Sequence, residues 1–193
     1  MTDETPNSLR ELLSRLSIPP HHAVLFTDGS GSKKVKPGGY AAILLLKQER
    51  RLVIRYGAAS HVSSQEAELR AVQEATNFLL SQDFVYRPNG YHVVHVTDSS
   101  YVAGKLQAVQ DPKDGPQTAY ASSTHRGLWV AIQAVSSLGI RIHSRHVPRN
   151  QNPLMEFVDS VSKLVRVQVT QTNAEVIELR NKLQSQFEKF PIA

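Results

Sequence analysis

The 193-residue sequence contains no cysteine, so it holds neither a disulfide framework nor a metal site built from thiolates. Long hydrophobic runs are also missing, because the longest aliphatic run, AAILLL, is far too short to cross a bilayer. The polar N-terminus, MTDETPNSLRELLSRL, lacks the basic start and apolar core of a secretion signal. We therefore expect a soluble protein of the cytoplasm or nucleoid, with no membrane partner.

What remains is the composition of an ordinary soluble domain, with 40% hydrophobic and 20% charged residues. The chain is long enough for one good core with additional segments at its ends. We assign residues 1–20 to an N-terminal helical extension, 21–166 to the core domain and 167–193 to a C-terminal helical extension. The net charge of +5 is compatible with an anionic partner but does not require one.

Hydrophobic periodicity and turn residues predict an α/β fold with a mixed sheet, in the order β-β-β-α-β-α-α-β-α. The predicted strands are 23–27, 39–46, 51–59, 92–97 and 140–147, of which the second and third form an antiparallel hairpin. The predicted helices are 64–80, 99–110, 125–139 and a last one that begins at Asn152-Pro153 and extends toward 190.

Two aspartates follow apolar runs in the same way, Asp28 in LFTDGS and Asp98 in HVTDSS. Each carboxylate is therefore expected just past the end of a strand. If the two strands are parallel neighbours, about 4.8 Å apart, both carboxylates face one crevice, where α/β sheets usually bind ligands. Adjacent buried carboxylates repel and need a proton or a cation. The alternative is that each aspartate only caps the turn or helix after it.

The helix at 64–80 adds a third carboxylate, because Glu68 lies on the same stripe as the apolar Val72 and Leu79. Glu66 belongs to a separate polar stripe and is expected in solvent. A carboxylate that points toward a core is costly unless it is paired or bound to a metal. Glu68 is therefore the more informative of the two glutamates.

The motifs TDGS, PGGYAAIL, EAEL and TDSSYV follow one another in this order. In this combination the sequence resembles a type 1 ribonuclease H over residues 23–165. The resemblance implies a ribonuclease H-like α/β fold, with a five-stranded mixed sheet of order 3-2-1-4-5 flanked by helices. It also implies an enzyme whose four carboxylates hold two Mg²⁺ (or Mn²⁺) ions and which hydrolyses the RNA strand of an RNA–DNA hybrid. Asp28, Glu68 and Asp98 match the first three carboxylates.

The fourth carboxylate has two candidates. MEFVDSVS matches the family pattern with Asp159 as the ligand, whereas VPRNQNPLME places Glu156 there. The two residues are three apart on a helix, so either one could reach the site. We favour Asp159 because the residues that follow it fit the pattern better.

The same choice affects the loop histidine of the family. His146 occupies its place if Glu156 is the ligand, and Arg149 does so if Asp159 is. In a catalytic role, His146 would ferry protons or help the product leave. The alternative is a structural or solvated histidine at the end of a strand.

The resemblance also implies how the carboxylates share the work. Asp28 and Asp98 are the expected central metal ligands. Glu68 is expected to bind one ion and to contact a ribose 2′-hydroxyl, the group that distinguishes RNA from DNA. Asp159 is expected to hold the ion that activates the attacking water, while the other ion stabilises the leaving 3′ oxygen.

Further positions match substrate contacts of the family or carry a suitable charge; they are Gly29, Ser30, Lys33, Lys34, Ser64, Gln65 and Ser100. The first two bring backbone close to the scissile strand. Ser64, Gln65 and Ser100 occupy places where the family often has asparagine or glutamine for minor-groove contacts. The lysines either bind phosphates or form a solvated turn.

The stretch at 110–126 departs from the family, because QDPKDGPQTAYASSTHR is nearly neutral where many members have a basic, Trp-bearing protrusion that grips DNA. The mixed charge of the C-terminal extension favours helix packing, so a protein partner or self-association through this helix is a further expectation. Two alternative functions stay open: a binding or scaffold module of this fold with little or no catalysis, and a nuclease for another substrate.

Overall fold

The computed structural model describes residues 23–31, 38–46, 51–59, 62–81, 90–110, 126–148 and 153–167, and the single positions 174, 177, 178 and 181. Several predictions fall outside these described residues: the N-terminal helix, Lys33, Lys34, Arg149, the loop at 111–123 and most of the C-terminal extension.

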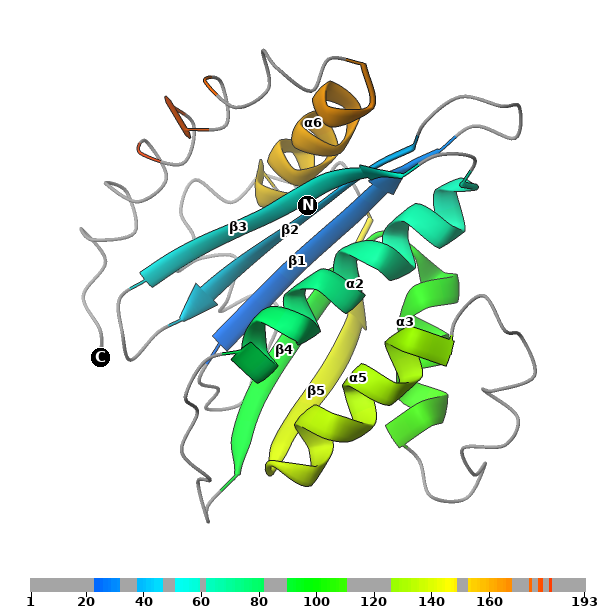
Figure 1. Ribbon diagram of the computed structural model, residues 1–193, viewed down its shortest axis with the longest axis vertical. Helices are drawn as coiled ribbons and strands as arrows, with labels where there is room; N and C mark the ends of the chain where they lie inside the picture. Colours follow the sequence, from blue (N-terminus) through cyan, green and yellow to red (C-terminus); the bar gives the residue numbers. More distant parts are fainter. Residues whose placement is uncertain are drawn as a thin grey trace, which may run out of the picture.

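Five strands form one mixed sheet: β1 (Ala23–Ser30), β2 (Gly38–Leu46), β3 (Arg51–Ala59), β4 (Tyr91–Thr97) and β5 (Ile140–His146). Their spatial order is β3-β2-β1-β4-β5, which confirms the predicted order (Figure 1). Strands β2 and β3 pair antiparallel, as predicted for the hairpin. Strands β1 and β4 are parallel neighbours, which meets the condition for Asp28 and Asp98 to share a crevice.

Among the boundaries that differ from the prediction, the end of β1 concerns the site. The strand expected at 23–27 continues to Ser30, so Asp28 lies inside β1 and not beyond its end. The reason is tertiary: β2 extends alongside, and Asp28 pairs with Ala41 while Ser30 pairs with Gly39. Turn-forming residues such as glycine and serine predict the end of a strand, but pairing with a neighbour overrides that local preference.

Four helices complete the described fold: α2 (Ser64–Ser81), α3 (Ser100–Gln110), α5 (Arg126–Ser137) and α6 (Pro153–Val167). Pro153 is the first residue of α6, as predicted, and Gly139 ends the segment after α5 with a φ of 79°. The continuation of the last helix toward 190 falls mainly outside the described residues. None of the helices in the described ranges has the length and apolar composition needed to span a membrane.

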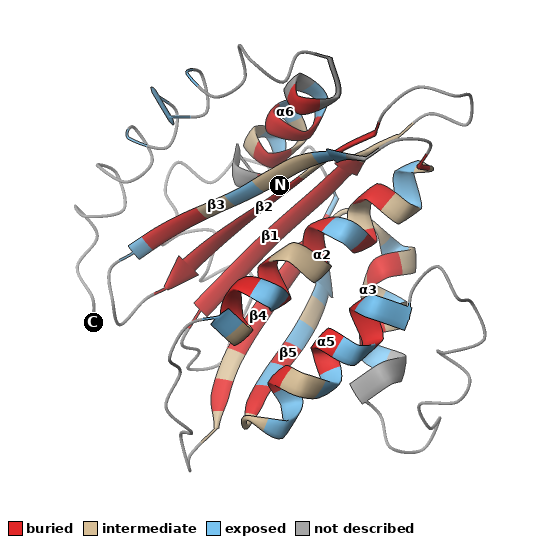
Figure 2. Cartoon of the chain, viewed as in Figure 1, coloured by how far each residue is buried: buried red, intermediate tan, exposed pale blue. Residues whose placement is uncertain are grey.

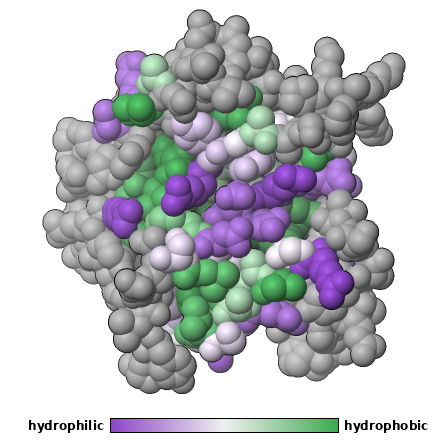
Figure 3. All heavy atoms as spheres, viewed as in Figure 1, coloured by the Kyte–Doolittle hydropathy of each residue, from purple (hydrophilic) through white to green (hydrophobic). Residues whose placement is uncertain are grey.

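The sheet lies between two helical layers (Figures 1 and 2). On one face, Ala23 and Leu25 of β1 pack with residues of α2 and α5. On the other face, Val24 and Phe26 pack with Met155 and other residues of α6. Because alternate residues of a strand point to opposite faces, a central strand buried on both sides reads as the continuous apolar run AVLF. Hydrophilic residues form a band across the face covered by α2 and α5 (Figure 3).

Candidate active site

Asp28 is held in the interior by a helix from the far end of the chain. Its side chain is 1% exposed, and β1 is the central strand of the sheet. The buried Ser162 of α6 donates a hydrogen bond from Oγ to Asp28 Oδ2, at 2.6 Å. A hydrogen bond to the ionised form offsets part of the cost of burying a carboxylate, and it fixes the orientation of the group.

Asp98 lies in the bend between β4 and α3, and it does not cap the helix. The cap is Ser99, whose Oγ accepts a hydrogen bond from the Val102 amide at 3.3 Å. The Ser99 amide in turn donates to Thr97 Oγ1 at 3.1 Å. Because Ser99 satisfies the start of α3, the capping explanation does not apply to Asp98.

Glu68 reaches the site because α2 lies directly on β1. Gly29 makes this possible: a Cβ at that position would collide with the backbone of Ala67 and Glu68. The start of α2 is fixed by a capping box, in which Ser63 donates from its amide to Glu66 Oε2 at 2.8 Å and the Glu66 amide donates to Ser63 Oγ at 3.2 Å. Glu66 was expected in solvent, and this is wrong: it is half-buried and caps the helix.

The three predicted carboxylates converge. One oxygen each of Asp28, Glu68 and Asp98 lies within 4.8 Å of the others, although the residues come from β1, α2 and the end of β4. Two carboxylate oxygens of these residues, Glu68 Oε2 and Asp98 Oδ1, are buried and accept no hydrogen bond, although both residues make other polar interactions. A set of oxygen donors that shares negative charge suits Mg²⁺ or Mn²⁺, so these residues fit the expected metal.

Comparison with known proteins finds a matching family. The family model described as RNase H matches residues 20–169. The chain belongs to the ribonuclease H family. It is 32% identical over 147 residues to the ribonuclease H of Helicobacter acinonychis (strain Sheeba), an alignment that covers 72% of this chain and 90% of that protein. The chain is accordingly a ribonuclease H-type hydrolase.

Solved structures of ribonucleases H share the fold. The N-terminal RNase H domain of Rv2228c from Mycobacterium tuberculosis superposes with a TM-score of 0.56 at 17% identity, covering 75% of this chain and 98% of that one. RNase H1 of Halobacterium salinarum NRC-1 superposes with a TM-score of 0.52 at 18% identity, covering 74% and 96%. LC11-RNase H1 in complex with an RNA/DNA hybrid gives 0.51 at 16% identity, covering 70% and 92%.

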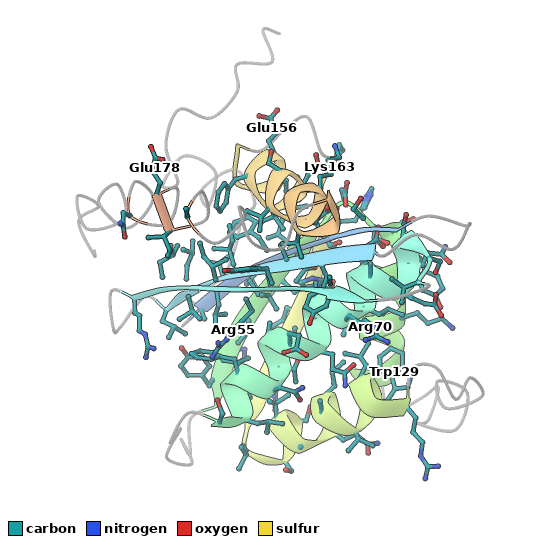
Figure 4. The ribbon with its side chains drawn as sticks, turned by 45° about the horizontal axis from the view of Figure 1, so that its top comes forward. Arg55, Arg70, Trp129, Glu156, Lys163 and Glu178 are labelled. Atoms are coloured by element: carbon teal, nitrogen blue, oxygen red, sulfur yellow. The ribbon has the colours of Figure 1, made fainter. Side chains whose placement is uncertain are left out.

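Both candidates for the fourth carboxylate, Asp159 and Glu156, lie on α6. Neither belongs to the group formed by Asp28, Glu68 and Asp98. Asp159 is half-buried and occupies the same turn as Ser162, whose Oγ also donates to the Asp159 carbonyl at 2.9 Å. Its Oδ2 accepts a hydrogen bond from Lys163 Nζ at 2.6 Å. Glu156 is exposed and points away from the sheet (Figure 4). The position of Ser162 therefore places Asp159, and not Glu156, on the side of α6 near Asp28.

His146 ends β5 next to the site. Its Nε2 donates a hydrogen bond to the backbone carbonyl of Asp98 at 3.1 Å, and the side chain is exposed. The imidazole is thus beside one of the three carboxylate-bearing residues. This location is compatible with the proton-transfer role, which stays a prediction.

The predicted substrate contacts that the structure describes surround the carboxylates. Ser64 and Gln65 are exposed at the start of α2, and Ser100 is exposed at the start of α3. Ser64 Oγ donates to the Gly31 carbonyl at 3.3 Å, which ties the end of β1 to the start of α2. Gly29 is expected to approach the substrate. A glycine is also needed at this position for the fold, because α2 packs on it.

One buried network near the site was missed. His95 is fully buried, with Nε2 2.7 Å from Thr27 Oγ1 and Nδ1 2.8 Å from Ser144 Oγ, so it links β1, β4 and β5. Burial lowers the pKa of His95 to about 3, so the imidazole is neutral and uses one nitrogen to donate and the other to accept. A signal existed: His95 alternates in phase with Val93, which predicts an inward position.

Replacing Gly29 by alanine is expected to lower the free energy of unfolding by about 1–3 kcal/mol, the usual cost of overpacking. The added methyl group meets helix backbone, which cannot rotate away, so α2 and Glu68 must shift. Nuclease activity should fall as well. Urea unfolding and a cleavage assay measure the two effects.

Gly104 is the matched control, because nothing lies within 4 Å of a Cβ built on this residue of α3. Gly104→Ala should stabilise the protein by about 0.5–1 kcal/mol through helix propensity and leave cleavage unchanged. Equal stability changes in the two variants would show that α2 does not depend on Gly29.

Proposed function

We propose that this chain is a divalent-metal-dependent endoribonuclease that hydrolyses the RNA strand of RNA–DNA hybrids. The observation that carries the proposal is the convergence of Asp28, Glu68 and Asp98 within 4.8 Å. Three adjacent carboxylates repel one another, so a fold that assembles them from three elements is best explained by a bound cation. Membership of the ribonuclease H family and the hybrid bound by LC11-RNase H1 support the choice of substrate.

In the proposed mechanism, Asp28, Glu68, Asp98 and Asp159 hold two Mg²⁺ or Mn²⁺ ions. Two metal ions bound there would supply an activated water and stabilise the leaving oxygen. The chain's own groups set the geometry: the Ser162 hydroxyl orients Asp28, and His146 is positioned at the Asp98 carbonyl. From there, His146 would accept or deliver a proton on the solvent side of the site.

Asp159 can serve as a ligand although it is paired with Lys163. Lys163 is 56% exposed, and a pair of this kind contributes only about 0–1 kcal/mol because solvent screens it. The free energy gained when a cluster of carboxylates binds a divalent cation exceeds the contribution of this pair. Rotation of the Asp159 side chain away from Lys163 is therefore the expected consequence of metal binding.

The test incubates the purified full-length chain with labelled RNA–DNA hybrid, double-stranded RNA and duplex DNA, each with Mg²⁺, Mn²⁺ or EDTA. We expect internal cleavage of the RNA in the hybrid with either metal and none in EDTA. Cleavage of double-stranded RNA alone would favour the alternative nuclease. Binding of hybrid with no cleavage under either metal would favour the scaffold alternative and overturn the proposal.

Two α6 variants distinguish the candidates for the fourth ligand. Asp159→Ala should lower hybrid cleavage about 100-fold, in line with the loss of a group that holds a metal. Glu156→Ala should stay within about threefold of the unmodified protein, because surface substitutions away from a site have little effect. Metal titrations of both variants measure whether the loss is in affinity. Loss in Glu156→Ala alone would reverse the assignment.

A further inference from the structure

A row of nitrogen-bearing side chains runs along the face of β4 and β5 that lies on the α6 side of the sheet. Its members, which we call the β4–β5 strip, are His92, Arg141, His143 and Arg145. Alternation determines the face: Ile140 and Ile142, which alternate with Arg141 and His143 on β5, pack on the opposite side with residues of α2 and α5. The strip has no role in the site described above.

The strip is open to solvent in the structure. Arg141, His143 and Arg145 are exposed and His92 is half-buried. Helix α6 packs on the neighbouring strands β1, β2 and β3 of the same face. Neither β4 nor β5 contains an aspartate or glutamate, so no carboxylate within these two strands balances the charge.

The members of the strip act on one another. His92 is the register partner of Arg141, and its Nδ1 lies 3.0 Å from His143 Nε2. Partial burial lowers the pKa of His143, and the neighbouring His92, Arg141 and Arg145 lower it further. The like charges on this open surface are therefore those of Arg141 and Arg145, and an anionic partner would relieve their repulsion.

The strip begins close to the carboxylates. Arg145 is the register partner of Val96, two residues before Asp98, while Arg141 lies at the other end of β5. At about 3.3 Å per residue the two arginines are about 13 Å apart along the strand. This length corresponds to about four nucleotides of one strand of a duplex.

We propose that the β4–β5 strip binds the phosphodiester backbone of a nucleic acid, outside the cleavage site. Two fixed positive charges on one strand, Arg141 and Arg145, with two imidazoles beside them, suit a polymer whose charges repeat at regular intervals better than they suit a folded acidic protein. Arginine forks such as those of Arg141 and Arg145 pair well with phosphate oxygens. The choice of nucleic acid as the anion rests on the proposed function, while the anionic character of the partner rests on the strip alone.

The test measures hybrid binding by fluorescence anisotropy in EDTA, where no cleavage competes, over a range of salt concentrations. Arg141→Gln/Arg145→Gln should raise the Kd about tenfold and reduce the slope of log K against log salt by about 2, because each lost phosphate contact removes about 0.9. Arg141→Lys/Arg145→Lys keeps the charge and should retain most of the salt slope.

The matched control removes two positive charges elsewhere. Arg51 and Arg55 lie on β3, at the other edge of the sheet and on its opposite face, over the Phe78 ring. Arg51→Gln/Arg55→Gln should change the Kd by less than about twofold. The proposal is overturned if the strip variant binds like the unmodified protein, or if the control loses as much affinity.

A second measurement needs no variant. Imidazole NMR signals of His92 and His143 should shift when hybrid is added to the unmodified protein, and an absence of shifts at saturation would overturn the proposal. Phosphatidylserine vesicles test the membrane alternative: loss of vesicle binding in the strip variant, with hybrid binding unchanged, would also overturn it.

The outcomes separate this proposal from the proposed function. If the protein binds hybrid through the strip in EDTA but does not cut it with Mg²⁺, the strip stands and the proposed function fails. If it cuts hybrid and the strip variant has an unchanged Kd and KM, the function stands and the strip proposal fails.

Discussion

Asp98→Asn is expected to reduce hybrid cleavage by at least about 1000-fold, as the loss of one member of a catalytic unit usually does. The amide keeps the shape of the side chain but removes one of the negative charges that converge with Asp28 and Glu68. The fold should not suffer. Without metal, relief of repulsion among the carboxylates should raise the free energy of unfolding by about 1 kcal/mol.

Single-turnover cleavage and thermal unfolding, each with and without Mg²⁺, measure these effects. Mg²⁺ should stabilise the unmodified protein and have little effect on Asp98→Asn, because only the former retains the full set of ligands. Glu178→Gln is the matched control: the residue is exposed and lies outside the cluster, so both properties should stay unchanged. An Asp98→Asn variant that cleaves at a normal rate would refute the metal site.

The second large effect concerns stability at acid pH. His95 has its pKa lowered to about 3 by burial, against about 6.5 in the unfolded chain. The unfolded state therefore binds the proton more readily, and stability is full above pH 6.5 and decreases as the pH falls toward 3. Between about pH 6.5 and about pH 3 the free energy of unfolding falls by about 4–5 kcal/mol, and about 2 kcal/mol of this is lost by about pH 5.

Urea unfolding at a series of pH values tests this expectation. His95→Gln should be less stable at neutral pH, because one amide cannot satisfy both Thr27 and Ser144, but its stability should depend much less on pH. His143→Gln is the control, since His143 is exposed and its replacement should retain most of the dependence. If His95→Gln keeps the full pH dependence, another group is responsible.

Much of the fold and of the candidate site of this protein was predicted from local patterns in its sequence. Apolar periodicity predicted every described strand and helix in the correct order, because burial on one or both faces imposes the pattern residue by residue. The motifs around Asp28, Glu68 and Asp98 identified the family and the three carboxylates that converge. These features depend on residues close together in the chain, so they can be read without the fold.

Other features depend on contacts between distant segments. The hydrogen bond from Ser162 to Asp28 joins residues 134 positions apart, and no local pattern predicts it. The extension of β1 through Asp28 is decided by pairing with β2, and the position of Glu68 depends on Gly29 meeting α2. His95 alternates as an inward residue, but its two partners become visible only when three strands are in register.

The sequence by itself thus determined the order of elements, the family and the three converging carboxylates. The tertiary structure alone decided how those carboxylates meet, which side of α6 is close to them and which basic residues line up along β4 and β5. The physical reason is that periodicity and motifs describe neighbours along the chain. Strand register and helix packing instead choose neighbours in space, and the chemistry of a site depends on those.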